Sequence, residues 1–372
     1  MDQRITNLAY NLIHHSVRLQ SGEKLLIELT DQGHPLAKAL MKEAYHAGGK
    51  PFLWIKDQSL LRSFLESASQ DQVALMGQWE ATFMNDMQAY IAIRGGYNNS
   101  ELSDLSAEAK KYYQTDWSQV VHTDIRLAKT KWCVLRWPNP SMAQQAKMST
   151  EAFEDFYYSV CGLDYSRLLK AQEPLKALFD STKKVEIIGP GTHLTFSIAD
   201  IPTVISHGLR NIPDGEVFTA PVKDSVEGFI TYNTPSTYQG IIHENVRLDF
   251  SKGKIIKAQS NCSAHLEEIF ATDEGASYIG EFALGVNPHI QNPIGDILFD
   301  EKITGSFHFT PGNAYLTADN GNRSAIHWDL VCMQTPAYGG GEIRFDGVVI
   351  RKDGKFVLPE LEALNPEQWI TK

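Results

Sequence analysis

A histidine and an aspartate lie two residues apart in the last quarter of the sequence, within an otherwise apolar run. The run covers residues 324–330 and contains His327, Trp328 and Asp329. On a strand, side chains at positions i and i+2 point to one face, roughly 6 to 7 Å apart along the backbone, so His327 and Asp329 could bind one ion. Trp328 would then pack in the core. The same pair is also typical of hydrogen-bonded core residues, so a metal site requires further ligands.

Three more side chains in the second half of the chain are of the kind that binds divalent cations. Glu216 and Glu281 each follow a glycine, and His308 stands between two phenylalanines. With His327 and Asp329 they form a carboxylate and imidazole set that suits zinc, cobalt or manganese and argues against copper(I) or an iron–sulfur cluster. The set is large enough for two ions. Taken alone, each residue also has an ordinary structural explanation. Glu216 could be a solvated glutamate at the start of a strand, and His308 could be a histidine packed in the core.

Two adjacent divalent ions would support hydrolysis. Such ions usually share a bridging carboxylate and a bridging water, whose lowered pKa yields hydroxide near neutral pH, and they polarise a carbonyl for attack. Two turn signals follow His308, so that Tyr315 and His327 can lie on strands next to it. Glu216 and Glu281 are distant in sequence, and only the tertiary fold can bring them to the same place.

Composition sets outer limits on the protein. The chain has 372 residues, of which 42% are apolar and 21% charged, and this size predicts two domains. We find no signal-peptide core and no run of 18 apolar residues, so the expected location is the cytoplasm and no membrane partner is expected. The net charge of -11 argues against nucleic acid as a partner and is compatible with cation binding. The four cysteines have no paired spacing and are expected to be reduced.

The first half alternates strands with amphipathic helices. This alternation predicts an α/β domain with a largely parallel, helix-covered sheet. The expected strands cover residues 24–29, 51–56, 89–94 and 131–137. The first expected helix begins near Pro35 and ends at Gly48-Gly49. A second helix is expected from about 60 to 75. Two capped helices are expected between 141 and 179, with a break near 149–150.

The second half changes to short strands separated by turn signals. It predicts a mainly antiparallel, β-rich domain with at least one helix, near residues 261–272, so the expected fold class is α/β plus α+β. We place the N-terminal α/β domain at 1–180, ending in a helical bridge, and the C-terminal metal-binding catalytic domain at 181–372. The glycines near 191 and 339–341 lack the spacing of a phosphate-binding loop and are interpreted as turns.

Several segments around these residues resemble the aminopeptidase T and aminopeptidase S family of metallopeptidases. The resemblance extends over nearly the whole chain. The segments that carry it are residues 22–24, 136–138, 141–143, 148–156, 211–217, 280–285, 298–303, 312–315 and 324–330.

The resemblance implies roles for individual residues. Glu216 and Glu281 match the family's metal-binding glutamates, with Glu281 as the bridging carboxylate, and His308, His327 and Asp329 match its remaining ligands. The resemblance thus implies two divalent ions, of zinc, cobalt or manganese, held by the whole set.

Two further residues take roles from the same resemblance. Glu301 lies in the family's Phe-Asp-Glu segment and is interpreted as a metal ligand, as an acceptor behind an imidazole, or as an ordinary strand-end glutamate. Tyr315, seven residues after His308, matches a tyrosine that could donate a hydrogen bond to the oxyanion of a tetrahedral intermediate. Its alternative is a buried aromatic residue after a turn. Glu281 and Tyr315 are therefore the predicted catalytic residues.

The sequence thus predicts a cytoplasmic metallo-aminopeptidase that removes N-terminal residues from short peptides. The resemblance further implies a homodimer whose sites face an enclosed cavity. Two alternatives remain: a homologue that binds metal or peptide without turnover, and a metal-dependent amidase or esterase.

Overall fold

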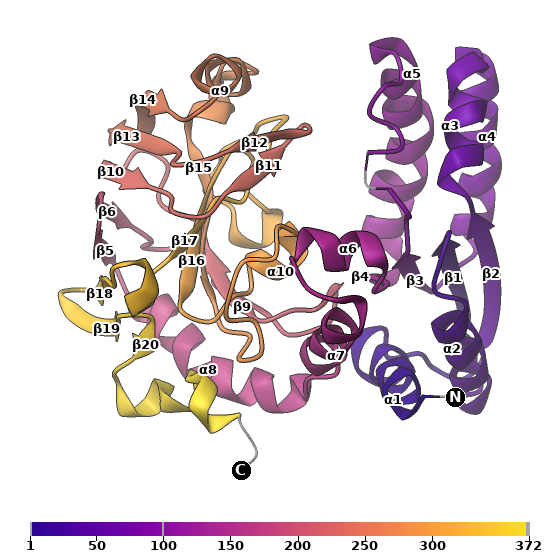
Figure 1. Ribbon diagram of the computed structural model, residues 1–372, viewed down its shortest axis with the longest axis horizontal. Helices are drawn as coiled ribbons and strands as arrows, with labels where there is room; N and C mark the ends of the chain where they lie inside the picture. The colour runs from indigo at the N-terminus through magenta and orange to yellow at the C-terminus, as the bar shows by residue number, and fades with distance from the viewer. Residues whose placement is uncertain (1, 99, 370–372) are drawn as a thin grey trace. The chain divides into compact units, whose positions relative to one another are not determined.

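The chain forms two compact units in the computed structural model, which describes residues 2–98 and 100–369 (Figure 1). Unit 1 comprises Met1–Leu163 and Gly208–Pro213, and unit 2 comprises Asp164–His207 and Asp214–Lys372. The predicted division into an N-terminal domain at residues 1–180 and a catalytic domain at 181–372 stays a prediction. No helix in the described part of the chain is long and apolar enough to cross a membrane.

Unit 1 contains a five-stranded sheet in the order β2-β1-β3-β4-β8 whose neighbours are all parallel. This confirms the predicted parallel sheet, and the four strands expected from sequence are present within one residue of their predicted ends. The strands are β1 (Lys24–Thr30), β2 (Lys50–Lys56), β3 (Ala89–Arg94), β4 (Lys131–Arg136) and β8 (Asn211–Ile212). The last of these was not expected, because two residues carry no recognisable pattern.

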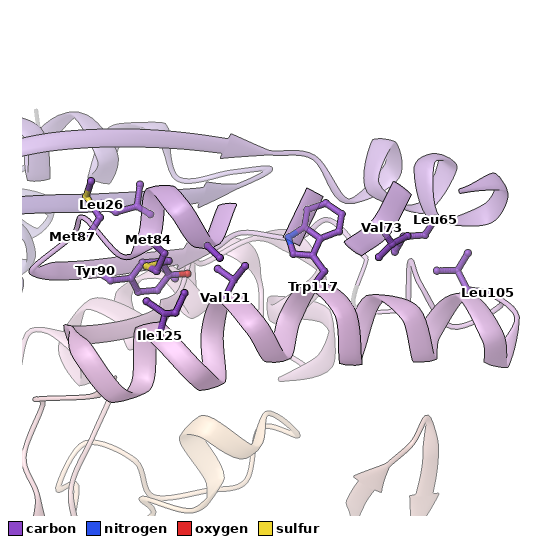
Figure 2. Packing of buried hydrophobic residues seen from close by; sticks show 12 residues of the cluster. Leu26, Leu65, Val73, Met84, Met87, Tyr90, Leu105, Trp117, Val121 and Ile125 are labelled. Atoms are coloured by element: carbon purple, nitrogen blue, oxygen red, sulfur yellow. The ribbon is translucent and has the colours of Figure 1, made fainter. Parts of the chain in front are cut away.

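The helices of unit 1 cover this sheet and enclose its core (Figure 1). Figure 2 shows one side of that core, where Met84 and Tyr90 lie beside Val121 and Ile125 beneath the sheet strand that carries Leu26. The helices are α1 (Gln3–Asn11), η1 (Leu12–Ser16), α2 (His34–His46), α3 (Gln58–Ser67), α4 (Gln70–Met84), α5 (Ala107–Tyr112), the π-helical η2 (Tyr113–Leu127), α6 (Pro140–Gln145) and α7 (Thr150–Cys161).

Two helical segments are divided more finely than the sequence predicted. The expected helix over 60–75 is two helices, α3 and α4, because the backbone of Ala68 is extended and Ser69 begins a new helix. The expected pair over 141–179 is three helices. Asn139, Ser149 and Asp164 each accept a hydrogen bond from a backbone N–H of the following first turn, so each side chain caps a separate helix.

Unit 2 consists mainly of antiparallel strands, as predicted. Its eight-stranded sheet has the order β14-β13-β10-β6-β5-β18-β19-β20, and its five-stranded sheet has the order β17-β16-β15-β9-β7. The strands are β5 (Lys184–Gly189), β6 (Thr192–Ser197), β7 (Val204–Ser206), β9 (Glu216–Thr219), β10 (Glu227–Thr231), β11 (Ser236–Tyr238), β12 (Ile241–His243), β13 (Arg247–Ser251), β14 (Lys254–Gln259), β15 (Ile279–Gly285), β16 (Ser306–Pro311), β17 (Val331–Met333), β18 (Glu342–Phe345), β19 (Val348–Lys352) and β20 (Lys355–Phe356).

The helices of unit 2 are few, and α9 confirms the one that was expected near 261–272. They are α8 (Tyr165–Ser181), α9 (Ser263–Phe270), α10 (Ile297–Asp300) and the 3-10 turns η3 (Glu274–Ser277), η4 (Leu316–Ala318), η5 (Pro336–Tyr338), η6 (Pro359–Leu364) and η7 (Pro366–Gln368).

Phenylalanines from both sheets of unit 2 meet in its core. The ring of Phe196 on β6 lies 5.0 Å from the rings of Phe282 on β15 and Phe309 on β16. Phe179 of α8 stacks on Phe282 from the side. Because successive strand residues point to opposite faces, this packing turns the neighbours of Phe282 and Phe309 toward the other face of the five-stranded sheet.

Candidate metal centre

The face of the five-stranded sheet opposite the phenylalanine core carries the first group of predicted ligands. Glu281 on β15 and His308 on β16 alternate with Phe282 and Phe309, and Ala283 pairs with His308 across the two antiparallel strands. Glu216, the first residue of β9, pairs with Gly285 at the far end of β15. Three neighbouring strands thus present Glu216, Glu281 and His308 on one surface.

These three side chains form a buried group. The Nε2 of His308 lies 3.0 Å from Oε1 of Glu281 and 3.5 Å from Oε2 of Glu216. One ligand atom from each residue lies within 4.8 Å of the others, the spacing of side chains able to hold one ion. All three residues are less than one-tenth exposed. A buried charge is stable only when it is paired or coordinates a metal.

A second group shares Glu281 with the first. The Nε2 of His327 lies 3.6 Å from Oε2 of Glu281 and 3.3 Å from Oδ1 of Asp329, and atoms of the three residues again fall within 4.8 Å of one another. The segment around His327 and Asp329 was expected to be a strand. Instead His327 makes an isolated antiparallel pairing with Gly312, and regular pairing begins only at Val331.

Neutral groups behind the second group orient its ligands. The Nδ1 of His327 is 2.8 Å from the backbone oxygen of Asn313, which leaves Nε2 turned toward the carboxylates. The hydroxyl of Thr310 donates to Oδ1 of Asp329 at 2.7 Å. Hydrogen bonds of this kind hold the orientation of metal-binding side chains. Sequence reasoning did not assign these roles to Thr310 and Asn313, although Thr310 lies two residues after His308 on the same strand face.

Lys302 is a buried cation that sequence reasoning missed. Its Nζ lies 2.6 Å from Oε1 of Glu216, 2.7 Å from Oε1 of Glu301 and 3.7 Å from Oδ1 of Asp214, and its side chain is 2% exposed. The signal for it was the lysine after Asp300-Glu301 in a segment flanked by apolar residues. A lysine is almost never buried unless it is paired.

Glu301 lies at the end of the short helix α10 and not on a strand. Among the described residues it belongs to neither of the two ligand groups, and it forms an ion pair with Lys302. Burial raises the pKa of Glu301 to about 8, although the charge of Lys302 opposes the shift. A direct role of Glu301 as a ligand stays a prediction.

The two histidines are held in their charged form by the carboxylates around them. Burial alone would lower the pKa of His308, but the hydrogen bond to Glu281 and the charge of Glu216 outweigh it and raise this pKa to about 9. Likewise, Asp329 outweighs burial and raises the pKa of His327 to about 10. His327 in turn lowers the pKa of Asp329, against the effect of burial. For Glu281 burial dominates and raises the pKa.

Unpaired polar atoms show that the groups fit a divalent cation. Across residues 2–98 and 100–369, Oε2 of Glu216, Oε2 of Glu281 and Nδ1 of His308 are among the buried side-chain atoms without a hydrogen-bond partner. Leaving a buried polar atom unsatisfied costs about 1–3 kcal/mol, and more when the group is charged. Carboxylate oxygens and imidazole nitrogens are zinc ligands, so a bound ion would satisfy the atoms that face it.

Tyr315 lies at the open side of the second group. Its ring centroid is 4.7 Å from that of His327 and 5.8 Å from that of Phe218, and its side chain is about half exposed. Partial burial of the phenol and the charges of Glu281 and Asp329 raise the pKa of Tyr315 well above its ordinary value, so the hydroxyl remains a hydrogen-bond donor. A wholly buried aromatic residue, the alternative interpretation, does not describe this position.

Trp328 packs in the core, as the sequence predicted. Trp328 points away from the two ligands beside it and stacks on Tyr238, with ring centroids 4.8 Å apart. His243 and His265 are hydrogen-bonded to one another and stand outside both ligand groups of the described chain.

A glycine next to Glu281 allows the chain to pass close to the turn after β16. A Cβ added to Gly280 would lie 2.4 Å from the backbone oxygens of both Gly312 and Asn313. We therefore expect Gly280→Ala to destabilise the protein by about 1–3 kcal/mol. Because the backbone oxygen of Asn313 also holds His327, the same substitution should weaken metal binding. Denaturant unfolding and zinc titration would measure the two effects.

Gly189→Ala is a matched control for this substitution, because its nearest neighbour would be at an ordinary 3.5 Å. Equal stability of the two alanine variants would contradict the close approach at Gly280.

The two groups of carboxylates and imidazoles are of the kind that binds divalent metal ions, and the comparison with family models agrees with a metal-dependent enzyme. Residues 1–356 match the thermophilic metalloprotease (M29) family. The chain therefore belongs to this family of metallopeptidases.

Curated relatives cover nearly the whole chain. Aminopeptidase AmpS of Bacillus subtilis is 24% identical over 88% of this chain and 88% of its own length. Aminopeptidase 2 of Geobacillus stearothermophilus is 25% identical over 91% and 92%. Aminopeptidase T of Thermus aquaticus is 23% identical over 93% and 95%.

Solved structures share the fold. Wild-type AmpT from Thermus thermophilus superposes with a TM-score of 0.80 at 21% identity and covers 96% of this chain and 99% of its own. The 2,5-dihydroxypyridine dioxygenase of Pseudomonas putida KT2440 has a TM-score of 0.60 at 12% identity and covers 96% and 98%. Because a dioxygenase shares the fold, function must be argued from the site residues and the family, not from the fold.

Proposed function

We propose that this protein is a metal-dependent aminopeptidase that removes N-terminal residues from short peptides. The observation that carries the proposal is the sharing of Glu281 between two ligand groups, since a shared carboxylate is typical of a two-metal hydrolytic site. The curated relatives are aminopeptidases, which supports the choice of an aminopeptidase among metallopeptidases.

The two groups define two proposed metal positions. The first position corresponds to the second ligand group described above, Glu281, His327 and Asp329. The second position corresponds to the first ligand group, Glu216, Glu281 and His308. Zinc, cobalt and manganese all suit these ligands. When bound, the ions would supply an activated water and polarise the scissile carbonyl.

The chain's own residues would orient the reactants. The phenol of Tyr315 is a neutral donor beside His327, and we assign it to the oxygen that becomes negative as the carbonyl is attacked. Glu281, held by His308, is the carboxylate common to both positions and is assigned as essential for turnover. An aminopeptidase acts on a free N-terminal amine, so a peptide with a blocked amine should not be a substrate.

The test compares a free with a blocked amine. We expect the protein to hydrolyse leucine p-nitroanilide, to lose this activity on chelation, and to regain it with zinc or cobalt. N-acetyl-leucine p-nitroanilide should not be hydrolysed. Hydrolysis of both compounds would indicate an amidase or esterase, and no hydrolysis by protein with a full metal complement would indicate a binding homologue.

Replacement of Tyr315 by phenylalanine tests the oxyanion role. We expect kcat to fall by about 10²–10³ with little change in KM or metal content, because a donor used only in the transition state is lost. Steady-state kinetics and elemental analysis measure these quantities. Tyr338→Phe, which removes a hydroxyl from the 3-10 turn η5, is the control and should keep full activity. An unchanged kcat in Tyr315→Phe would remove Tyr315 from the mechanism.

The resemblance also implies a homodimer, and this stays a prediction. Light scattering during gel filtration would measure the molecular mass against the 41.7 kDa of one chain.

A further inference from the structure

The ammonium group of Lys302 contacts a ligand of only one of the two proposed metal positions. It lies 2.6 Å from Oε1 of Glu216, a ligand of the second position. The hydrogen bond holds one oxygen of Glu216 and leaves Oε2 facing His308 without a hydrogen bond of its own. Lys302 therefore both orients Glu216 and offsets its negative charge.

The first position has a different surrounding. Its exclusive ligands, His327 and Asp329, are held by the backbone oxygen of Asn313 and the hydroxyl of Thr310. Both partners are neutral, so Asp329 keeps its full negative charge for an ion. Charges of like sign repel strongly where water is excluded. Among the described residues, no lysine or arginine forms an ion pair with His327 or Asp329.

The carboxylates available to the two positions differ accordingly. Glu281 serves both positions, so within the two groups found among the described residues Glu216 is the carboxylate that belongs to the second position alone. An ion in the second position would share Glu216 with a permanent ammonium. Because metal affinity depends on the negative charge of the ligands, the second position should bind more weakly.

Lys302 has little freedom to move away. Its backbone oxygen accepts a hydrogen bond from the N–H of Asn287, and the side chain of Asn287 donates to the backbone oxygen of Asp214. Asp214 and Glu301 flank the ammonium, and the side chain is almost completely buried. Removal of the charge from this pocket would leave these carboxylates without their common partner.

We propose that Lys302 makes the two metal positions unequal: the first binds a divalent ion tightly, and the second binds one weakly and exchangeably. This proposal rests on the two-metal function proposed above. Lys302 is a positioning residue that acts through Glu216 and would not touch the substrate.

The test is a count of bound zinc as a function of free zinc. Protein is dialysed against metal-buffered solutions of increasing free Zn²⁺, and the zinc content per chain is measured by mass spectrometry. Wild-type protein should take up one ion first and the second only at free zinc at least tenfold higher. Lys302→Met removes the charge but keeps the length of the side chain. In this variant the free zinc concentrations at which the first and the second ion bind should differ only a few-fold.

Two variants separate charge from structure. Lys302→Arg keeps the positive charge and should retain two separate steps. Lys355→Met removes an exposed lysine that pairs with Glu367 and should behave as wild type. Circular dichroism at saturating zinc reports whether each variant is folded.

The wild-type measurement decides the proposal even if Lys302→Met does not fold. Uptake of two ions in a single step by the wild type would overturn it, and so would a folded Lys302→Met in which these two zinc concentrations differ as much as in the wild type. Absence of stoichiometric zinc from every folded variant would contradict the proposed metal function itself, a different outcome.

Discussion

Replacement of Glu281 by glutamine is expected to reduce turnover by at least about 10³-fold while the protein remains folded. Glutamine keeps the size of the side chain but carries no charge, and Glu281 is the one residue that belongs to both ligand groups. Its loss should therefore weaken both metal positions at once. Glu281 is 3% exposed and lies 3.0 Å from Nε2 of His308, and the amide oxygen of glutamine can still accept a hydrogen bond from that nitrogen, so the variant is expected to fold.

Two measurements check this result. Hydrolysis of leucine p-nitroanilide gives the loss of turnover, and zinc titration gives the loss of affinity at the two positions. Glu244→Gln, at an exposed position after β12, is the matched control and should keep both properties. A Glu281→Gln protein with near-normal activity would place the reaction elsewhere in the molecule.

Metal binding is expected to release protons and to strengthen steeply with pH. In the metal-free protein the pKa of His308 is raised to about 9 and that of His327 to about 10, so both imidazoles carry an extra proton at pH 7. A histidine binds a metal only in its neutral form. Protons and metal therefore compete, and the affinity of each position should rise about tenfold per pH unit between pH 6 and pH 9.

Calorimetric titration with zinc at pH 7 in buffers of different ionisation enthalpy counts the released protons. We expect nearly one proton per ion from the imidazoles, and fewer as the pH approaches the raised pKa values. His193→Gln is a control, because His193 is an exposed histidine that pairs with Glu186 and should not contribute. An affinity that does not change between pH 6 and pH 9 would contradict the ligand roles of both histidines.

The regular elements were predicted most reliably where the local pattern is strong. The buried strands β1 and β3 and the helix α2, which begins at His34 with Pro35 in its first turn, were expected from apolar runs, proline and glycine. The division between α3 and α4 was missed because apolar residues continue across the break at Ala68, and only the backbone there shows that the helix ends.

The site was predicted in its ligands but not in its supporting contacts. The spacing of His327 and Asp329 is visible in the sequence, and the family resemblance added Glu216, Glu281 and His308. The expected strand through His327 is instead a single pairing with Gly312. The backbone there still places the two ligand atoms 3.3 Å apart. Their proximity therefore needs an extended backbone but no regular strand.

The sequence by itself determined the kind of chemistry available, because carboxylates and imidazoles bind divalent cations wherever they converge. Only the tertiary structure decided that Glu281 lies between two groups and that Lys302 pairs with Glu216. The physical reason is strand register. Glu216, Glu281 and His308 meet because β9, β15 and β16 pair in one alignment, and a slip of one residue would turn a side chain to the opposite face. Contacts between residues so distant in sequence leave no periodic pattern from which they could be predicted.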